Sequence, residues 1–207
     1  VDGLGIAIPE FLEPDELESF EIGTKMTFSD GRVTLNAAAY RINWDNIPIS
    51  FVAPTCQQFS TINGGKSKSE GVELEVRMHV TDAIIMDVSA SYNDAILTED
   101  NSLGSKGDSL PGSADVNAFI ALEYGFNVGG NEAFIRGDYS YVGEYYNNVA
   151  ETGEASGDYG QINLSSGIAL SDFDISLFVN NLTDEDKFTW VEASLSGSAY
   201  RLRPRTI

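Results

Sequence analysis

Residues Gly71–Val80 read GVELEVRMHV, and apolar and polar side chains alternate strictly along them. In an extended chain, where successive side chains point to opposite faces, one face carries Val72, Leu74, Val76, Met78 and Val80. The other face carries Glu73, Glu75, Arg77 and His79. A helix would mix these two sets. The stretch therefore predicts a β-strand that is apolar on one side and polar on the other.

The same alternation continues on both sides of this stretch. Downstream, Ile84, Met86 and Val88 alternate with Asp87 and other polar residues. In chain order, the predicted strands are Phe20–Phe28, Val33–Ile47, Gly71–Val80, Ile84–Asn93, Ala114–Tyr124, Glu132–Tyr146, Tyr159–Leu170 and Phe173–Asn180. A further strand is expected to begin within Arg201–Ile207.

The connections alternate in length. Short links, rich in the Gly, Asp, Asn and Ser of tight hairpins, are expected at Ser29–Arg32, Thr81–Ala83, Gly125–Asn131 and Ser171–Asp172. Long links lie between them, at Pro48–Lys68, Ala95–Ser113, Asn147–Asp158 and Asn181–Tyr200. In an up-and-down barrel this alternation places every long loop on one rim, as in outer-membrane barrels. The sequence thus predicts an all-β, antiparallel up-and-down transmembrane β-barrel wall.

Composition narrows the partners of this chain. No window approaches the run of about 18 apolar residues typical of a membrane helix, so contact with lipid would be made by strands. The formal net charge of −20 argues against nucleic acid as a partner, because phosphate binding needs clustered cations. Cys56 is the single cysteine, which leaves a pairing outside this segment or a free thiol.

Aromatic residues gather where a membrane barrel has its two interfacial girdles. Those expected near the long-loop rim are Trp44, Tyr92, Tyr139, Tyr141 and Tyr145, and those near a short turn are Tyr124 and Phe126. The alternative is a soluble β-sandwich whose apolar faces meet in a dry core. Such sandwiches usually have shorter strands and no one-sided difference in loop length.

Several stretches in order resemble the C-terminal barrel of TonB-dependent receptors. The match begins with ELESFEIGTKMTFSDGRVTLNAAAYRINWDNI, continues with NGGKSKSEGVELE, LPGSADVNAFIALEY and YVGEYYNN, and ends with VNNLTDEDKF and RLRPRTI. The most specific parts are Asn180–Asp184 and Arg203–Thr206. Val1–Asp15 is the least informative.

The resemblance implies an architecture larger than this chain. A barrel of that family has about 22 strands around a plug. Residues 1–207 are interpreted as a C-terminal part of the outer-membrane barrel domain, about eight strands plus the start of the last. The N-terminal plug domain and the final closing strand are expected to lie outside the chain. The implied partners are outer-membrane lipid and, through the plug region, a TonB-type energy-transducing protein.

The sequence gives little support for a catalytic site or a metal-binding site. His79, the only histidine, is expected to face the lumen beside a short turn, and no nucleophile motif accompanies it. Glu73 and Glu75 share a face at a spacing that suits paired carboxylates, but Arg77 and His79 continue the same stripe, which favours a lumen-facing wall. The acidic runs near Glu99 and Asp184 do not fit a calcium loop. No catalytic residue, metal site or cofactor is predicted.

The implied function is energy-coupled import of a scarce nutrient, which includes ferric siderophores, haem, cobalamin and carbohydrates. Aromatic faces beside amides suit stacking on aromatic chelators or sugars. The candidate ligand-binding residues on the extracellular rim are Tyr145, Tyr146, Asn147, Asn148, Trp190 and Tyr200. The alternative is a passive porin or a surface adhesion or structural barrel without energy coupling.

Overall fold

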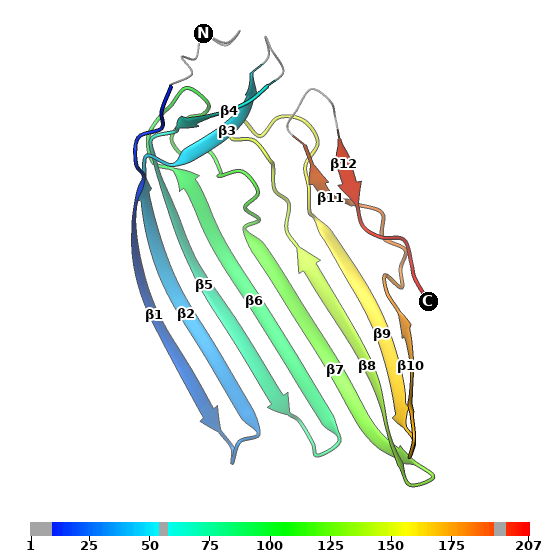
Figure 1. Cartoon of the computed structure of the whole chain (residues 1–207). Helices are drawn as coiled ribbons and strands as arrows, with labels where there is room; N and C mark the ends of the chain where they lie inside the picture. Colours follow the sequence, from blue (N-terminus) through cyan, green and yellow to red (C-terminus); the bar gives the residue numbers. More distant parts are fainter. Residues whose placement is uncertain (1–9, 54–57, 193–197) are drawn as a thin grey trace.

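An eight-stranded antiparallel sheet dominates the computed structural model, which describes residues 10–53, 58–192 and 198–207 (Figure 1). The strand order is β1-β2-β5-β6-β7-β8-β9-β10, so each strand of the sheet pairs with the next one along the chain. The bounds are β1 Glu16–Phe28, β2 Val33–Asp45, β5 Lys66–His79, β6 Ile84–Leu97, β7 Val116–Val128, β8 Asn131–Val142, β9 Tyr159–Ala169 and β10 Asp174–Val179. The predicted up-and-down order is confirmed.

Two of the predicted long loops contain hairpins of their own. β3 (Pro48–Ala53) pairs with β4 (Gln58–Asn63), and β11 (Phe188–Val191) pairs with β12 (Ala199–Arg201). Both lie at the long-loop end of the sheet (Figure 1). None of the described residues forms a helix long and apolar enough to cross a membrane.

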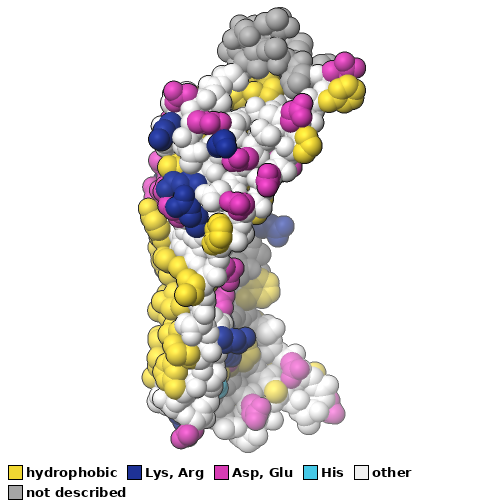
Figure 2. Space-filling view, turned by 90° about the vertical axis from the view of Figure 1, so that its left-hand side faces the viewer, with side chains coloured by type: hydrophobic (Ala, Val, Ile, Leu, Met, Phe, Trp, Pro, Cys, Tyr) yellow, Lys and Arg dark blue, Asp and Glu magenta, His cyan; other side chains and the backbone are white. Residues whose placement is uncertain are grey.

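Cross-strand pairing keeps each face of the sheet uniform. Val72 of β5 lies opposite Ala39 of β2 on one side and Tyr92 of β6 on the other, and Tyr92 lies opposite Val116 of β7. Because side chains alternate along every strand, this register collects the apolar residues on a single face. Figure 2 shows the hydrophobic side chains as a continuous patch along one side of the molecule.

The apolar patch ends abruptly at its upper edge. One pairing step above Val72 and Tyr92, the same face carries Arg41, Glu70 and Asp94 in register. The guanidinium Nη1 of Arg41 lies 2.9 Å from a carboxylate oxygen of Glu70. Basic and acidic side chains gather at this level above the hydrophobic patch (Figure 2). The charged row therefore sets the upper limit of the surface suited to hydrocarbon.

Short turns close the opposite end of the sheet. The β7–β8 link consists of Gly129 and Gly130, whose φ values of 60° and 87° lie in the left-handed region that two-residue hairpins need. Sequence had predicted a longer link, Gly125–Asn131, but β7 extends to Val128. The strand continues because the glycine pair alone makes the turn.

Two further expectations need correction. Trp44 is not a girdle residue: it lies on the face opposite the apolar patch and packs against the buried cluster under the loops. Tyr145 lies beyond the end of β8, and its hydroxyl donates to the carbonyl of Thr189 at 2.6 Å, which holds it among the loops. The start of a further strand, expected within Arg201–Ile207, is confirmed by an antiparallel bridge between Asn180 and Thr206, next to the end of β10. Cys56 lies outside the described residues.

The tightly packed core of the described chain lies under the long loops. Its buried members are Ile47, Ile49, Leu97 and Val149, with Trp44, Leu103 and Leu110 packed against them. The two faces of the sheet stay largely open, as expected of a barrel wall that meets lipid on one side and the lumen on the other.

We expect a charged side chain on the apolar face to destabilise the protein in a bilayer. Leu122 lies in the middle of that face on β7 and is 50% exposed. In the complete protein folded into lipid vesicles, Leu122→Arg is expected to lower the free energy of unfolding by about 2–4 kcal/mol. Urea titration measures the loss. The control Ser89→Arg places the same side chain on the polar face opposite Glu75, where the loss should stay below about 1 kcal/mol. Equal losses in both variants would contradict the assignment of the two faces.

Candidate functional site

The strands deliver four loop regions to one rim, and hydrogen bonds join these regions in chain order. The side chain of Asn101 donates to the carbonyl of Gly64, at the end of the β3–β4 hairpin, at 2.5 Å. The Gly112 amide donates to the carbonyl of Tyr146 at 2.7 Å, and the Gly157 amide to that of Phe188 at 2.9 Å. Each long loop is thus fixed to the next, which gives the rim a defined shape.

A cavity of about 520 Å³ lies among these joined loops. This rim pocket is lined by Trp44, Ile47, Pro48, Ile49, Ser50, Phe51, Phe59, Leu110, Pro111, Asn147, Trp190 and Glu192. Its volume and its mainly apolar and aromatic lining, with few polar groups, are typical of a small-molecule site.

The floor of the rim pocket is continuous with the buried core. Trp44, Ile47 and Ile49 belong both to the lining and to the cluster under the loops. A Cβ at Gly64 would come within 2.2 Å of the Ile49 side chain, so a glycine there lets the β3–β4 hairpin pack closely over the core. The Trp44 indole N–H donates to Asp15 at 2.7 Å, which fixes the ring.

Asn147 supplies the most distinctive polar group of the lining. Its side-chain nitrogen donates to the Ser156 hydroxyl at 3.0 Å and to the Val191 carbonyl at 2.7 Å. Both hydrogens of that nitrogen therefore have partners. The side-chain oxygen Oδ1 is buried and accepts no hydrogen bond. A buried oxygen without a donor is costly, and because this oxygen has almost no accessible surface it is enclosed by the packed loops and presents no acceptor to the pocket.

Of the six rim residues predicted from sequence, the structure places two in the lining of the rim pocket and four outside it. Asn147 and Trp190 line the pocket. Tyr145 and Asn148 serve the loops instead: Tyr145 bonds to β11, and the Asn148 side chain closes a turn with Thr152. Tyr146 and Tyr200 are absent from the described lining, and Tyr200 is 67% exposed.

Sequence reasoning missed most of the aromatic wall. Phe51 and Phe59 come from the β3–β4 hairpin, within a stretch that had been predicted only as a long loop. The signal was present as alternation in Pro48–Val52, where Ile49 and Phe51 flank Ser50. Trp44 was noticed, but its face was wrongly assigned.

The predicted wall residues Glu73, Glu75, Arg77 and His79 lie together on the polar face of β5. Arg77 lies 3.2 Å from Asp87, and Arg136 lies 3.6 Å from the same carboxylate and 3.5 Å from Glu123. These ion pairs cross β5, β6, β7 and β8, so they form one network along the polar face. This is compatible with the proposed lumen-facing role of the four residues.

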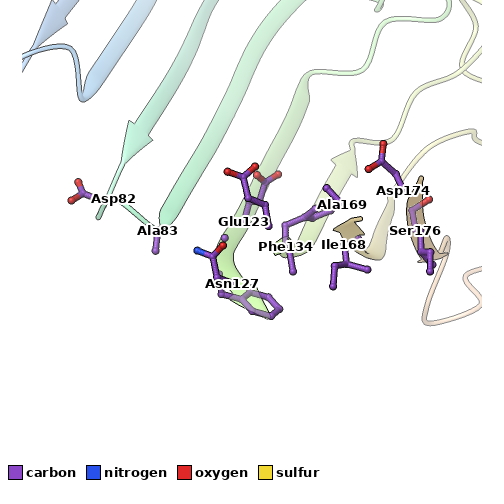
Figure 3. A pocket seen from close by; sticks show the side chains of 15 residues that line it. Asp82, Ala83, Glu123, Asn127, Phe134, Ile168, Ala169, Asp174 and Ser176 are labelled. Atoms are coloured by element: carbon purple, nitrogen blue, oxygen red, sulfur yellow. The ribbon is translucent and has the colours of Figure 1, made fainter. Parts of the chain in front are cut away.

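A second hollow, of about 730 Å³, lies at the short-turn end near β10. Figure 3 shows Asp174 and Ser176 on one side of it and Glu123, Asn127 and Phe134 on the other. Its walls mix the two faces of the sheet, since Ile168 and Ile175 belong to the apolar face. The β7–β8 hairpin extends beyond the end of β10 here, and the hollow is the recess that this leaves (Figure 1). We therefore do not assign it as the ligand site.

No metal site is assigned to this chain. In residues 10–53, 58–192 and 198–207, no three His, Cys, Asp or Glu side chains come together in a cluster that could hold a metal ion.

A family model described as "TonB dependent receptor-like, beta-barrel" matches residues 3–182. Two curated proteins are similar to parts of the chain. The probable TonB-dependent siderophore receptor PiuA of Acinetobacter baumannii is 33% identical over 90 residues, which cover 44% of this chain and 11% of PiuA. The metal-pseudopaline receptor CntO of Pseudomonas aeruginosa is 25% identical over 175 residues, which cover 83% of this chain and 24% of CntO. The matched stretches thus cover less than a quarter of the length of these curated relatives.

Solved structures match the fold over almost the whole chain. The siderophore receptor PiuA from Acinetobacter baumannii matches with a TM-score of 0.77 and 26% identity, over 97% of this chain and 28% of that one. The ferric yersiniabactin uptake receptor FyuA from Yersinia pestis matches with a TM-score of 0.77 and 22% identity, over 92% of this chain and 28% of that one. At that identity, FyuA supports the fold alone.

We expect the Tyr145 hydroxyl to hold β11 against the rim. Tyr145→Phe removes its hydrogen bond to Thr189 and should increase amide exchange in β11 roughly fivefold, which corresponds to about 1 kcal/mol for one hydrogen bond. Hydrogen–deuterium exchange of the complete protein measures this. The control is Tyr146→Phe, because Tyr146 accepts the hydrogen bond from Gly112 with its backbone carbonyl, which the substitution keeps. Unchanged exchange in Tyr145→Phe would contradict the proposed anchor.

Proposed function

The chain belongs to the TonB-dependent receptor-like β-barrel family, and on that premise we propose that its rim pocket binds part of a metal chelate for import. Proteins of this family are outer-membrane receptors and transporters, not enzymes. The apolar face of the sheet accordingly meets outer-membrane lipid, and the long loops face the outside.

The rim pocket is the observation that carries this proposal. Four aromatic side chains, Trp44, Phe51, Phe59 and Trp190, line a cavity held by loops that are bonded to one another. Aromatic faces provide large contact areas for flat chelating groups at low entropy cost. PiuA is named as a siderophore receptor and CntO as a metal-pseudopaline receptor, which favours a metal chelate over haem, cobalamin or a carbohydrate.

We propose that the polar face of the sheet serves transport, as the rim pocket serves binding. Its ion-pair network crosses β5, β6, β7 and β8 in the half of the wall nearer the short turns, away from the loop rim. We propose that this face borders the lumen, that Glu73, Glu75, Arg77 and His79 contact water or a plug there, and that a TonB-type protein supplies energy through residues outside this chain. The wall would then guide the chelate without chemical change.

A passive porin or adhesion barrel remains the second candidate, since an amphipathic wall serves either function. Energy dependence distinguishes the two. Import through a porin continues after the proton gradient is collapsed, whereas energy-coupled import stops.

The uptake prediction uses a deletion strain complemented with the complete receptor. Radiolabelled ferric and other metal chelates are supplied singly, and uptake is measured with and without a proton uncoupler. We expect uptake of at least one chelate, and its loss on uncoupling. The double variant Phe59→Ala, Trp190→Ala should reduce that uptake roughly tenfold, because two stacking faces are removed.

The control is Phe173→Ala, which removes a 60% exposed aromatic side chain in the short turn between β9 and β10, at the end of the sheet opposite the rim. It should import normally when its surface abundance matches the wild type. Uptake that persists in the uncoupled cells would support the porin instead. Full uptake by the double variant would exclude the rim pocket as the binding site.

A further inference from the structure

Two stretches outside the rim pocket, Asn180–Asp184 and Arg203–Thr206, lie against each other at the upper end of β10. They are the two ends of the last long loop, which carries β11 and β12 (Figure 1). The backbones of Asn180 and Thr206 exchange two hydrogen bonds, of 2.9 and 3.1 Å. The side chain of Asp184 accepts a hydrogen bond from the Arg205 amide at 2.8 Å. Direct hydrogen bonds therefore close the base of this loop.

Asn181 lies at the centre of the closure and is 1% exposed. Its side-chain nitrogen donates to the carbonyls of Glu185 and Arg203, each at 2.9 Å. Its side-chain oxygen accepts from the Glu185 amide at 2.8 Å. Both hydrogens and the oxygen thus have partners, as a buried amide group requires. One side chain joins the start of the last loop to its end, 22 residues later along the chain.

The backbone of the turn explains why Asn and Asp occupy two of its positions. The φ values of Asn181 and Asp184 are 54° and 56°, in the left-handed region that Asn and Asp adopt more readily than most other residues with a side chain. The Asp184 amide donates to the Asn181 carbonyl at 2.9 Å, which closes the turn. The same two side chains then bind the returning segment. The local sequence therefore determines both the shape of the turn and its partner.

The turn is also fixed to the wall of the barrel. The backbone amide of Asn181 donates to the side-chain oxygen of Asn163 on β9 at 2.9 Å. The Leu182 amide donates to the Ile162 carbonyl on the same strand at 2.8 Å. Asn163 in turn donates to a carboxylate oxygen of Asp138 on β8 at 2.8 Å. The base of the last loop is thus tied to strands that do not belong to the loop.

A continuous series of backbone contacts leads from this base to the rim pocket. Beyond Asn181, the Leu202 amide donates to the Lys187 carbonyl at 3.0 Å. The pairing of β11 with β12 follows, and it places Trp190 opposite Tyr200. Trp190 forms one wall of the rim pocket. Because paired strands hold each other in register, the position of Trp190 depends on where the two ends of the loop are joined.

We propose that Asn181 is a positioning residue of the rim pocket. By joining the two ends of the last loop and fixing them to β9, it holds the β11–β12 hairpin, and with it the Trp190 wall, at the rim. This rests on the proposed function, because it names a residue that positions the proposed binding site. Asn181 is not among the described lining residues, so it acts through Trp190 and touches no ligand itself.

Two glycine variants of the complete receptor in detergent test this role by hydrogen–deuterium exchange. Asn181→Gly removes the side chain and tolerates the positive φ, and Asp184→Gly removes the exposed carboxylate that holds Arg205. Exchange in β11, β12 and residues 205–206 should rise roughly tenfold in Asn181→Gly, which loses three hydrogen bonds. The rise should be smaller in Asp184→Gly, which loses one.

The matched control is Asn180→Gly. It makes the same exchange one residue earlier, where the contacts with Thr206 use backbone atoms that the substitution keeps. Exchange in β11 and β12 should stay at the wild-type rate. Tyr145→Phe is a second reference: it releases β11 from the neighbouring loop and should leave residues 205–206 protected, because the base of the last loop stays closed.

The position of Trp190 is measured by fluorine NMR. The receptor is labelled with 5-fluorotryptophan, and the Trp190 resonance is identified by its absence in Trp190→Phe. In Asn181→Gly this resonance should move toward the frequency of free 5-fluorotryptophan, because the indole leaves the rim pocket. The resonance of Trp44, whose ring is fixed by Asp15, should change less.

A cross-link at the base of the loop tests whether closure is the cause. Antiparallel residues that exchange both hydrogen bonds have Cα atoms about 5.5 Å apart, within the reach of a disulfide. Asn180→Cys and Thr206→Cys are therefore combined with Asn181→Gly, and Cys56→Ser removes the native thiol of this chain. Oxidation should restore slow exchange in β11 and β12 and the wild-type Trp190 resonance. Reduction should abolish this rescue.

Unchanged exchange and an unchanged Trp190 resonance in both glycine variants would overturn the positioning role of Asn181. An increase in exchange shared by β7 and β8 would show general destabilisation and would also overturn it, as would a cross-link without rescue. If Asn181→Gly does not fold, Asp184→Gly decides, because Asp184 and Arg205 are both exposed. No chelate enters these measurements, so a receptor without energy-coupled uptake can still give the expected results, and a receptor with such uptake can lack them.

Discussion

Backbone hydrogen bonding in hydrocarbon is the constraint on which the structure depends. An N–H or C=O group without a partner is costly where water is absent, so a wall built of strands must pair each strand with its neighbours. The continuous ladders from β1 to β10 meet this requirement between the two edges of the sheet. Pairing then fixes the register, and register with a two-residue period separates an apolar face from a polar one. A shift by one residue would place Glu73 and Arg77 against lipid.

The same constraint moves the packed core to one end of the molecule. A sheet with lipid on one side and a lumen on the other has no second layer to bury, and its faces stay open. Burial occurs where the long loops fold over the strand ends, around Ile47, Leu97 and Val149. Loops with a core of their own hold a shape, and the bonds that join Gly64, Asn101 and Tyr146 to neighbouring loops extend that order across the rim. A preformed pocket is possible there for this reason.

Charge is distributed according to the solvent that each part meets. The apolar face stops at the row of Arg41, Glu70 and Asp94, where opposite charges are paired. The polar face pairs Arg77 and Arg136 with Asp87. The rim is different, because its acidic residues far exceed its cations.

Sequence by itself determined the eight strands and their order, and also the two faces of the strands over Gly71–Val80 and Ile84–Asn93, because period-two alternation records which side meets lipid. It also located the rim, since loop length follows from the two ends of a barrel. The lining of the rim pocket was only partly predicted: Asn147 and Trp190 were among the candidate rim residues, but Phe51, Phe59 and the inward side of Trp44 were missed. The tertiary structure decided these points, because pocket walls depend on which loops pack together. That packing comes from contacts between residues far apart in sequence, such as the Asn147 side chain and the Val191 carbonyl, and no local pattern encodes it.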